Sequence, residues 1–370
     1  MNEPTKNLLV LVVDDSVVVR SVVRALLNGV PGLEVDVARN GRIALEAIAS
    51  RVPDFVLLDV EMPELDGIST LREIRKLHPR LPVVMFSTLT ERGAAVTLDA
   101  LAAGANDYLP KPVAAAGFET MREQLRVDIT SRIEAMCRRE RSPATARPAL
   151  ATPQPPRVPR TRRGDTVDIV AIGSSTGGPN ALLEVFGRLP ADFPVPIVVV
   201  QHMPAMFTTM LAKSLDAKSP LAVGEARGGE TLLPGHAWVA PGGYHMTVSR
   251  RGEVGTLALN QQAPECSCRP AVDVLFRSLA ESYGARCLAV VLTGMGVDGS
   301  AGAAVLHAAG SQVVAQDEAT STVWGMPGSI VRAGLADAVL PLSEIADEIV
   351  RRVGRGAVRV PATTTGRSTP

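Results

Sequence analysis

Continuous apolar runs alternate with stretches of helical periodicity along the first third of the chain. The run at residues 8–13 is apolar throughout, which is typical of a strand buried on both faces of a sheet. Runs at residues 54–59 and 81–87 have the same character and end in polar residues. Apolar residues at helical spacing separate these runs, at residues 17–27, 41–50, 68–78 and 92–103. The repeating strand–helix units predict a flavodoxin-like, doubly wound parallel sheet.

A second series of the same kind occupies the carboxyl-terminal half of the chain. Strand-like runs lie at residues 168–173, 197–201, 287–293 and 312–316. Helical patterns lie at residues 180–188, 206–219, 271–283 and 301–309. This alternation predicts a second doubly wound, mostly parallel α/β sheet with helices on both faces.

The segment between the two series has a composition of its own. Residues 141–164 hold six prolines and six arginines, no acid, one leucine and one valine. Such a segment buries too little apolar surface to offset its ordering entropy, which predicts an extended linker. We therefore divide the chain into a first domain at residues 1–130, a helix end and Pro/Arg-rich linker at 131–165, a second domain at 166–355 and a flexible tail at 356–370.

Composition and charge narrow the class of protein. The chain has 38 basic and 38 acidic residues, with a net charge of −3 before residue 141, +6 in the linker and −3 after residue 164. Neither domain therefore carries the basic excess that a nucleic-acid partner requires. No apolar run approaches the ~18 residues of a membrane span, and no signal-peptide core precedes the first strand. We expect a cytoplasmic protein with no membrane insertion and no nucleic-acid partner. The four cysteines are too few and too irregularly spaced for a disulfide scaffold.

Polar residues stand where several predicted strands of the first domain end. Asp14 and Asp15 follow the first strand, Asp59 ends the third, Ser87 ends the fourth and Lys111 follows the fifth. The carboxyl ends of parallel strands share one edge of the sheet, so these side chains converge. Three carboxylates repel one another unless a cation is bound, and Mg²⁺ binds a few carboxylates while leaving room for a phosphoryl oxygen. The set indicates phosphoryl transfer, with Ser87 and Lys111 stabilising the charge of the transferred group.

These motifs also carry a resemblance to a known family. Residues 8 to about 128 resemble the receiver domain of two-component response regulators, through Val13-Asp14-Asp15-Ser16, Asp59-Val60-Glu61-Met62-Pro63, Asp66-Gly67, Phe86-Ser87 and Lys111-Pro112. The resemblance implies that Asp59 accepts a phosphoryl group from a histidine kinase. It implies that Asp14, Asp15, Asp59 and the backbone carbonyl of Glu61 hold Mg²⁺, and that Ser87 and Tyr108 are the switch residues. A receiver is an input, so we expect the output in the second domain.

A glycine-rich turn follows the first strand of the second domain. In Gly173-Ser174-Ser175-Thr176-Gly177-Gly178-Pro179 the glycines allow a sharp turn, and the next helix offers free N–H groups. The turn can cradle a phosphate or present Ser175 as a nucleophile. No lysine follows the glycines, which excludes a Walker loop, and the glycine spacing excludes a dinucleotide fingerprint. The spacing alone leaves a plain tight turn as an equal alternative.

Two further strand ends supply partners for this serine. His202 directly follows the run at 197–201, and Asp298 lies in the glycine-rich loop after the run at 287–293. Ser175, His202 and Asp298 can therefore meet at one edge, as nucleophile, proton carrier and orienter of the imidazole. The backbone N–H groups of Thr176 and Met295 are the candidate oxyanion donors.

We assign no catalytic role to the other histidines, aspartates and cysteines of the second domain that could take part in catalysis. His236 and His245 are interpreted as loop or packing residues, His307 as a helix-surface residue, Asp273 as a first-turn helix acid and Asp317 as a solvated loop acid. Cys266 and Cys268 form a Cys-x-Cys pair with no histidine or further cysteine nearby in the sequence. We expect no metal site there.

The second domain resembles the catalytic domain of the chemotaxis protein-glutamate methylesterases. The resemblance rests on Gln201-His202-Met203-Pro204, Ala240-Pro241-Gly242-Gly243, Leu292-Thr293-Gly294-Met295-Gly296-x-Asp298-Gly299 and Trp324-Gly325-Met326-Pro327. It implies a serine hydrolase, needing no cofactor for its reaction, that demethylates glutamyl γ-methyl esters on the cytoplasmic methylation helices of chemoreceptors and deamidates particular glutamines. Ser175, His202 and Asp298 take the triad positions.

Two other hypotheses about the function of the second domain remain open from the sequence. In one, the second domain is not an enzyme and binds a partner or nucleotide through the glycine-rich turn. In the other, it is a serine hydrolase for a different ester. For the methylesterase, we expect that the unphosphorylated first domain covers the Ser175 edge, and that phosphorylation of Asp59 loosens the contact.

Overall fold

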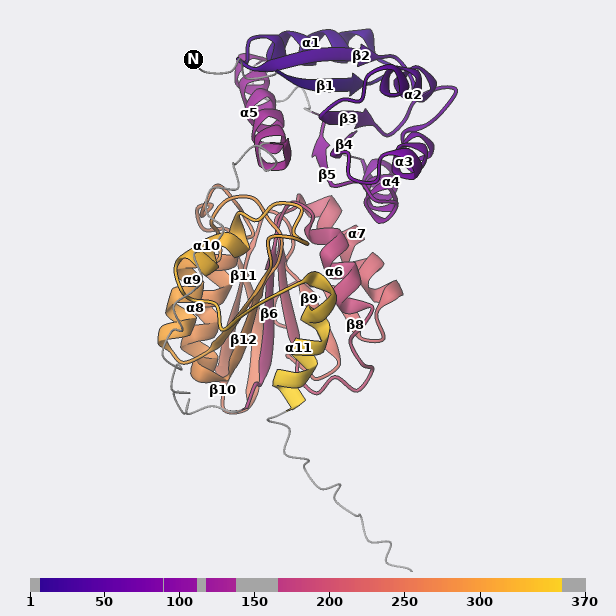
Figure 1. The fold of residues 1–370 in the computed structure, drawn as a ribbon. Coiled ribbons are helices and arrows are strands. Elements are labelled where there is room, and N and C mark those ends of the chain that lie inside the picture. The colour runs from indigo at the N-terminus through magenta and orange to yellow at the C-terminus, as the bar shows by residue number, and fades with distance from the viewer. Residues whose placement is uncertain (1–6, 89, 112–117, 138–165, 355–370) are drawn as a thin grey trace, which may run out of the picture.

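Two α/β domains make up the part of the chain that the computed structural model describes, which is residues 7–88, 90–111, 118–137 and 166–354 (Figure 1). We call the described residues up to Cys137 the N-terminal domain and those from residue 166 the C-terminal domain. The predicted linker at 141–164 and the predicted tail at 356–370 lie outside the described residues, so both stay predictions.

The N-terminal domain is a five-stranded parallel sheet with strand order β2-β1-β3-β4-β5, so the flavodoxin-like prediction is confirmed. Strands β1, β3 and β4 are buried along their whole length. The elements are β1 (Leu8–Val13), α1 (Val17–Asn28), β2 (Leu33–Ala38), α2 (Gly41–Ser50), β3 (Phe55–Asp59), α3 (Gly67–Leu77), β4 (Val83–Ser87), α4 (Glu91–Ala102), β5 (Asp107–Pro110) and α5 (Phe118–Cys137).

Polar residues start the helices of this domain at defined positions. The side chains of Ser16, Asn40 and Asp66 accept hydrogen bonds from backbone N–H groups in the first turns of α1, α2 and α3. Such caps satisfy donors that have no partner within the helix. These caps fix where α1 and α3 begin, just after the loops that carry the strand-end carboxylates.

The C-terminal domain is built on a seven-stranded sheet of order β14-β13-β12-β6-β7-β9-β8, in which every pairing is parallel. Helices α6, α7 and α11 cover one face, while α8, α9, α10 and an antiparallel hairpin of β10 and β11 cover the other (Figure 1). The elements are β6 (Ile169–Ser174), α6 (Gly178–Phe186), β7 (Ile197–Gln201), α7 (Ala205–Lys218), β8 (Ala222–Glu225), β9 (His236–Val239), β10 (His245–Arg251), β11 (Val254–Asn260), α8 (Val272–Tyr283), β12 (Cys287–Val291), α9 (Ser300–Ala308), β13 (Gln312–Gln316), α10 (Met326–Arg332), β14 (Ala338–Leu340) and α11 (Leu342–Gly354).

The segment from 233 to 244, for which the sequence pattern predicted no strand, is partly a strand. It contains β9, which pairs with β7 and with the edge strand β8. Three of the strands that the sequence pattern missed, β8, β9 and β14, have three or four residues and only partial burial, so they show no long apolar run. The seven-residue strands β10 and β11 were missed as well, because exposed or half-buried residues interrupt their buried ones. His236 begins β9, and His245 begins β10 with its side chain fully buried.

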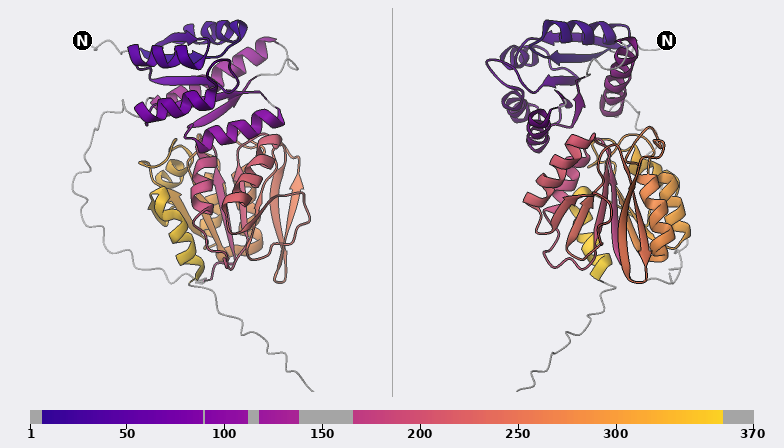
Figure 2. Two further views of the ribbon diagram at one scale, coloured as in Figure 1. Left: turned by 90° about the vertical axis from the view of Figure 1, so that its right-hand side faces the viewer. Right: turned by 180° about the vertical axis from the view of Figure 1, so that it is seen from behind.

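The two domains are packed against each other through apolar side chains. Helix α4 lies across the ends of α6 and α7, as both views in Figure 2 show. One cluster of buried apolar residues continues from the N-terminal domain into the C-terminal domain. Within the described residues, no helix is long and apolar enough to cross a membrane.

Gly67, at the start of α3, has no room for a side chain, because the edge of the N-terminal sheet is tightly packed around it. A Cβ on Gly67 would lie 2.1 Å from the carbonyl oxygen of Asp59, whereas a Cβ on Gly29 would meet nothing within 4 Å. Gly67→Ala is expected to lower the free energy of unfolding by about 1–3 kcal/mol, because backbone atoms must move. The matched control Gly29→Ala is expected to leave it unchanged or raise it by up to about 1 kcal/mol. Urea unfolding followed by circular dichroism measures both, and equal effects would contradict this packing.

Candidate functional site

The register of the N-terminal sheet brings the predicted carboxylates together. Val13 of β1 lies opposite Leu58 of β3, so Asp14 and Asp59 emerge side by side one residue later. Ligand oxygens of Asp14, Asp15 and Asp59 all lie within 4.8 Å of one another. The Lys111 ammonium is 2.8 Å from Asp14 Oδ2 and 2.8 Å from Asp59 Oδ2, which ties the two buried carboxylates to the end of β5.

One lysine does not neutralise this cluster. Burial raises the pKa of the Asp59 carboxyl to about 6; the hydrogen bond from Lys111 opposes the rise and the charge of Asp14 adds to it. A divalent ion with oxygen ligands would supply the missing positive charge, so the donor set fits Mg²⁺. The Glu61 side chain is exposed, and its backbone N–H donates to the Asp59 carboxylate.

The two predicted switch residues lie on the neighbouring strands β4 and β5. Ser87 ends β4, and its hydroxyl is buried and donates to the carbonyls of Thr88 and Gly93 at 3.3 Å each. Tyr108 is on β5, and its ring faces away toward the C-terminal domain. There it stacks on the buried ring of Phe207 of α7, with centroids 4.4 Å apart.

The glycine-rich turn of the C-terminal domain holds Ser175 at the carboxyl end of β6. Gly177 has a φ of +77°, which glycine adopts at low cost and which lets α6 begin at once. The backbone of Ser175 is fixed on both sides, since its N–H donates to Thr293 O and its carbonyl accepts from the Gln201 amide at 2.9 Å. Gln201 also accepts a hydrogen bond from Ser174 Oγ at 2.7 Å. The serine therefore sits on a rigid turn.

Strand register also places His202 beside this serine. Ser174 of β6 lies opposite Gln201 of β7, so Ser175 and His202 both follow at the same edge. The His202 N–H continues the ladder by donating to Ser174 O at 3.1 Å. The side chain of His202 is only 10% exposed, and its Nε2 is 2.7 Å from Asp298 Oδ2.

Asp298 is held by backbone donors as well as by the imidazole. Its Oδ2 accepts from Val272 N at 2.7 Å, and its Oδ1 accepts from the N–H groups of Asp273 and Gly299 at 2.9 Å each. Two of these donors belong to the first turn of α8, whose end favours a negative charge. Burial acts to raise the pKa of Asp298, but His202 and these N–H groups hold it below its usual range.

The protonation of His202 depends on the same contacts. Burial acts to lower its pKa, but the hydrogen bond with Asp298 and the contact with Cys268 outweigh burial and raise the pKa to about 9. The ring is therefore a strong base that a carboxylate orients. This is the arrangement that activates a hydroxyl nucleophile.

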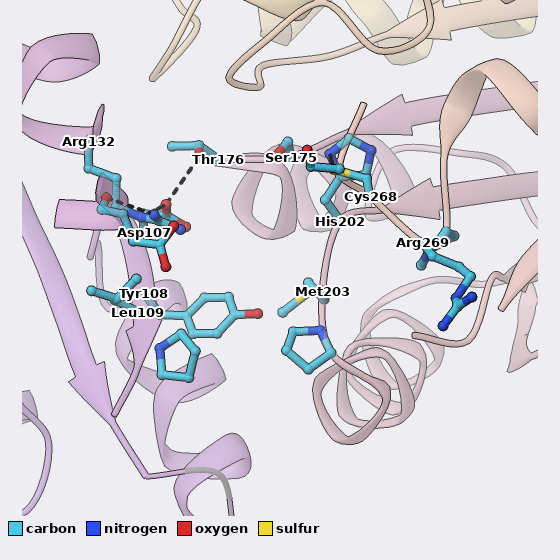
Figure 3. A pocket seen from close by; sticks show the side chains of 15 residues that line it. Asp107, Tyr108, Leu109, Arg132, Ser175, Thr176, His202, Met203, Cys268 and Arg269 are labelled. Carbon is cyan, nitrogen blue, oxygen red and sulfur yellow. Dashed lines mark hydrogen bonds and ion pairs between the residues drawn. The ribbon is translucent and has the colours of Figure 1, made fainter. Parts of the chain in front are cut away.

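A cavity of about 350 Å³ lies between the two domains and contains this edge (Figure 3). Ser175, Thr176 and His202 line it, whereas Met295, the second predicted oxyanion donor, does not. No hydrogen bond joins Ser175 Oγ to His202 in the described part of the chain. The residues that line the cavity are Asp107, Tyr108, Leu109, Pro110, Asp128 and Arg132 from the N-terminal domain, and Ser175, Thr176, His202, Met203, Pro204, Ser267, Cys268, Arg269 and Pro270 from the C-terminal domain.

Two hydrogen bonds connect the domains next to this cavity. Thr176 Oγ1 donates to Asp107 Oδ2 at 3.1 Å, and the same oxygen accepts from Arg132 of α5 at 2.9 Å. Asn180 of α6 donates to the carbonyl of Ala105 at 3.1 Å. No motif in the sequence points to Asp107 or Arg132, because their roles arise only when the domains pack together.

Cys268 has a histidine beside it in the fold, although the sequence shows none near it. Its Sγ lies 3.5 Å from His202 Nδ1, although the two residues are far apart in the sequence. His245 packs inside the fold, where Ala271 N donates to its Nδ1 and its Nε2 contacts the carbonyl of Ala263. Asp273 does lie in the first turn of α8 as predicted, but it is buried and accepts from Gly302 N at 2.6 Å.

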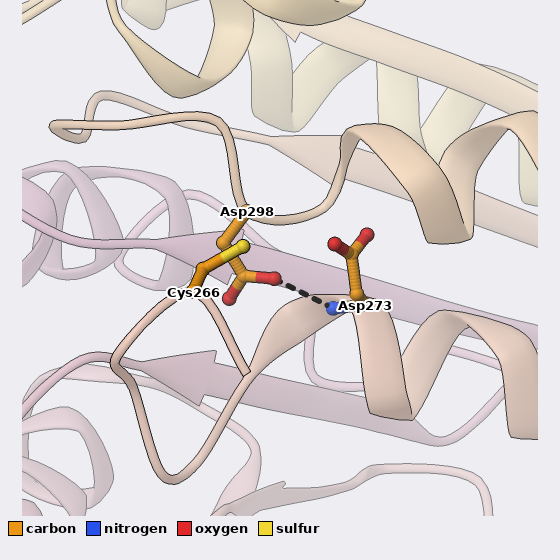
Figure 4. A group of neighbouring side chains, drawn as sticks. All are labelled: Cys266, Asp273 and Asp298. Carbon is orange, nitrogen blue, oxygen red and sulfur yellow. Dashed lines mark hydrogen bonds between the residues drawn. The ribbon is translucent and has the colours of Figure 1, made fainter. Parts of the chain in front are cut away.

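The second cysteine of the pair lies among carboxylates. Ligand atoms of Cys266, Asp273 and Asp298 are within 4.8 Å of one another (Figure 4). Each oxygen of Asp298 already accepts two hydrogen bonds, so this carboxylate has little capacity left for a cation. We assign no metal to this group.

One molecule thus joins a domain with a carboxylate cluster at its sheet edge to a domain with a hydrolase-like edge, through contacts of β5 and α4, as in a response regulator with an enzyme as its output. Residues 10–123 match the family model described as response regulator receiver domain, and residues 170–349 match that described as CheB methylesterase. A protein-glutamate methylesterase/protein-glutamine glutaminase of Trichodesmium erythraeum is 47% identical over 352 residues, covering 93% of this chain and 99% of that protein. A protein-glutamate methylesterase/protein-glutamine glutaminase of Nocardioides sp. is 48% identical over 352 residues, which cover 94% of this chain and 95% of that protein.

A solved structure is similar to the C-terminal part alone. The CheB methylesterase catalytic domain of Thermotoga maritima is 43% identical, with a TM-score of 0.49 over 50% of this chain and 98% of that one. The full-length relatives decide the assignment: this chain belongs to the protein-glutamate methylesterase/protein-glutamine glutaminase family.

The electrostatics of the histidine can be tested without an enzyme assay. We expect an NMR titration to give a pKa of about 9 for His202, and a value near or below the ordinary 6.5 in Asp298→Asn, because burial stays while the carboxylate is lost. The matched control is Asp192→Asn, an exposed carboxylate at the other end of β7. An unchanged titration in Asp298→Asn would show that this contact does not set the pKa.

Proposed function

We propose that the C-terminal domain hydrolyses glutamyl γ-methyl esters on chemoreceptors and deamidates particular glutamines, with Ser175, His202 and Asp298 as its catalytic residues. The observation that carries the proposal is the His202–Asp298 pair, 2.7 Å apart and nearly buried, on the same cavity as Ser175. The register of β6 and β7 supports the same grouping.

The chemistry is acyl transfer. Asp298 is hydrogen-bonded to Nε2 of His202, which leaves Nδ1 as the nitrogen that can accept a proton. Nδ1 would accept the proton of Ser175 as the serine Oγ attacks the glutamyl carbonyl. His202 must be neutral for this step, so the rate rises with pH toward the pKa of about 9. The proton then passes to the leaving methanol, or to ammonia from an amide. Water hydrolyses the glutamyl-enzyme by the reverse transfers.

The oxyanion that forms needs nearby N–H donors. Thr176 follows the nucleophile and lines the cavity, and its backbone N–H is our first candidate. The N–H of Met295 is the second candidate, although Met295 does not line the cavity in this arrangement of the domains. Both lie on glycine-containing loops at the same edge of the sheet.

We propose that Asp59 accepts a phosphoryl group from a histidine kinase and that this relieves inhibition by the N-terminal domain. Asp14, Asp15, Asp59 and the carbonyl of Glu61 would hold Mg²⁺, which supplies charge neutralisation for phosphoryl transfer. Lys111 contacts Asp59 now and would contact the phosphoryl group afterwards. Ser87 and Tyr108 would then rearrange, which would remove the Tyr108 ring from Phe207 and weaken the contact between the domains.

This proposal keeps the division of the chain made from the sequence, with the linker at 131–165 connecting the domains at 1–130 and 166–355. The receptor methylation helices that would be its substrates are cytoplasmic, so we propose a cytoplasmic location for the protein. The reaction at Ser175 requires no cofactor.

The role of the serine is tested by substitution. Ser175→Ala is expected to lower methanol release from methylated receptor membranes at least about 10³-fold, because the acyl-enzyme can no longer form. Ser249→Ala, an exposed serine on the hairpin, is the matched control and should keep the wild-type rate. A serine-directed phosphonate should label the wild type at Ser175. Labelling without receptor demethylation would indicate another ester as substrate, and undiminished methanol release from Ser175→Ala would reject the triad.

Inhibition by the N-terminal domain is tested at the interface. Asn180→Ala removes the hydrogen bond to Ala105 and should raise the rate of the unphosphorylated protein about 2- to 10-fold, which corresponds to the worth of one hydrogen bond. The rate after treatment with a phosphodonor should match that of the treated wild type. Asp59→Asn, treated in the same way, should stay at the low rate. Equal changes in the phosphorylated and unphosphorylated states would contradict inhibition through this contact.

A further inference from the structure

Cys268 and Ser175 depend on the same atom. His202 has two ring nitrogens, and Asp298 occupies Nε2 at 2.7 Å. The remaining nitrogen, Nδ1, contacts Cys268 Sγ at 3.5 Å. A thiol, an imidazole and a carboxylate are thus already in line, in the order that activates a cysteine nucleophile. The hydroxyl of Ser175 lines the same cavity but has no such hydrogen bond among the described residues.

A tight turn fixes the position of this thiol. The backbones of Glu265 and Cys268 exchange hydrogen bonds of 2.8 Å and 3.1 Å, and the two residues between them, Cys266 and Ser267, have φ values of 50° and 62°. The turn brings Cys268 to the cavity, where it is half-buried, and leaves Cys266 exposed outside it. Both thiols belong to one turn, but only one of them contacts a base.

We propose that Cys268 is a thiol-modification site that takes a low-molecular-weight disulfide and thereby switches the hydrolase off. The inhibitory part of this inference rests on the proposed function, because it assumes that His202 serves Ser175. The modification itself needs only the contact between Cys268 and His202.

The exchange balances without a further reactant. The Cys268 proton passes to His202 Nδ1, and the thiolate attacks one sulfur of the small disulfide. A bond forms between Cys268 Sγ and that sulfur as the original S–S bond breaks. The leaving thiolate takes the proton from Nδ1. The Cys268 sulfur is oxidised and the leaving sulfur is reduced, and a thiol reductant reverses the step.

The adduct would occupy the place of the substrate. The cavity has a volume of about 350 Å³, and Cys268 and Ser175 both line it. A group attached to Sγ fills the space next to Ser175 and stands between its hydroxyl and Nδ1. Hydrolysis therefore stops while the adduct is present and returns when it is reduced.

Cys266 provides a stringent comparison for Cys268, because exposure alone predicts that Cys266 reacts first. Cys266 is exposed, but its partial burial and the charges of Asp298 and Asp273 raise the pKa of its thiol, which disfavours the reactive thiolate. The other two cysteines, Cys137 and Cys287, are buried. Selective reaction at half-buried Cys268 would identify the histidine contact as the cause.

The probe for the first experiment is dithiobis(nitrobenzoate), used on the full-length folded protein. Peptide mass spectrometry at short times should find the adduct on Cys268 about tenfold more often than on Cys266. His202→Gln should slow the reaction at Cys268 by a similar factor and leave Cys266 unaffected. Preferred reaction at Cys266, or an unchanged Cys268 rate in His202→Gln, would overturn the proposal.

A second measurement connects the adduct to the hydrolase. Labelling of Ser175 by a serine-directed phosphonate is compared in each protein before treatment, after it, and after reduction. The ratio of treated to untreated labelling should fall at least about tenfold in the wild type and in Cys266→Ser, recover on reduction, and stay near one in Cys268→Ala. A fall in Cys268→Ala would overturn the inference. Absence of Ser175 labelling in untreated wild type would instead reject the proposed function, while the adduct experiment would still decide the modification.

Discussion

The contact between His202 and Asp298 is the interaction on which the C-terminal edge depends. Asp298 accepts four hydrogen bonds, three of them from backbone N–H groups, so it remains charged although it is buried. That charge orients the imidazole and raises its basicity. Because two of the donors belong to the first turn of α8, helix, loop and histidine are positioned as one unit. Loss of the carboxylate would remove the orienter of the ring and leave the end of α8 with unsatisfied donors.

The packing of two parallel sheets explains why regulation and chemistry meet. Ligand sites of such sheets lie at the carboxyl ends of the strands, and here the last strand of the N-terminal sheet reaches that edge of the C-terminal sheet. Asp107 and Tyr108 of β5 contact Thr176 and Phe207 directly. The buried apolar cluster that spans both domains makes this contact a packed interface.

The sequence predicted what depends on local pattern and register. Buried central strands show as continuous apolar runs, and residues that follow such strands must share an edge, which is why Asp14 and Asp59, or Ser175 and His202, could be grouped in advance. Short, partly buried strands such as β8 and β9 have no apolar run and were missed. Cys268 was missed for a different reason, since a turn brings it to His202 from 66 residues away and nothing near it in the sequence records that approach. Likewise, the bond between Asp107 and Thr176 exists only because the domains pack together.

The shortness of β5 has a consequence for how a signal crosses the molecule. This strand begins at Asp107, which holds Thr176, and Lys111 directly after it holds Asp59. From Asp107 to Lys111 the extended chain rises by about 13 Å, so the hydrogen bond to Thr176 and the ion pair with Asp59 lie at opposite ends of one short strand. Tyr108 lies between these two ends, so the strand that meets the proposed phosphorylation site also carries the ring that stacks on Phe207.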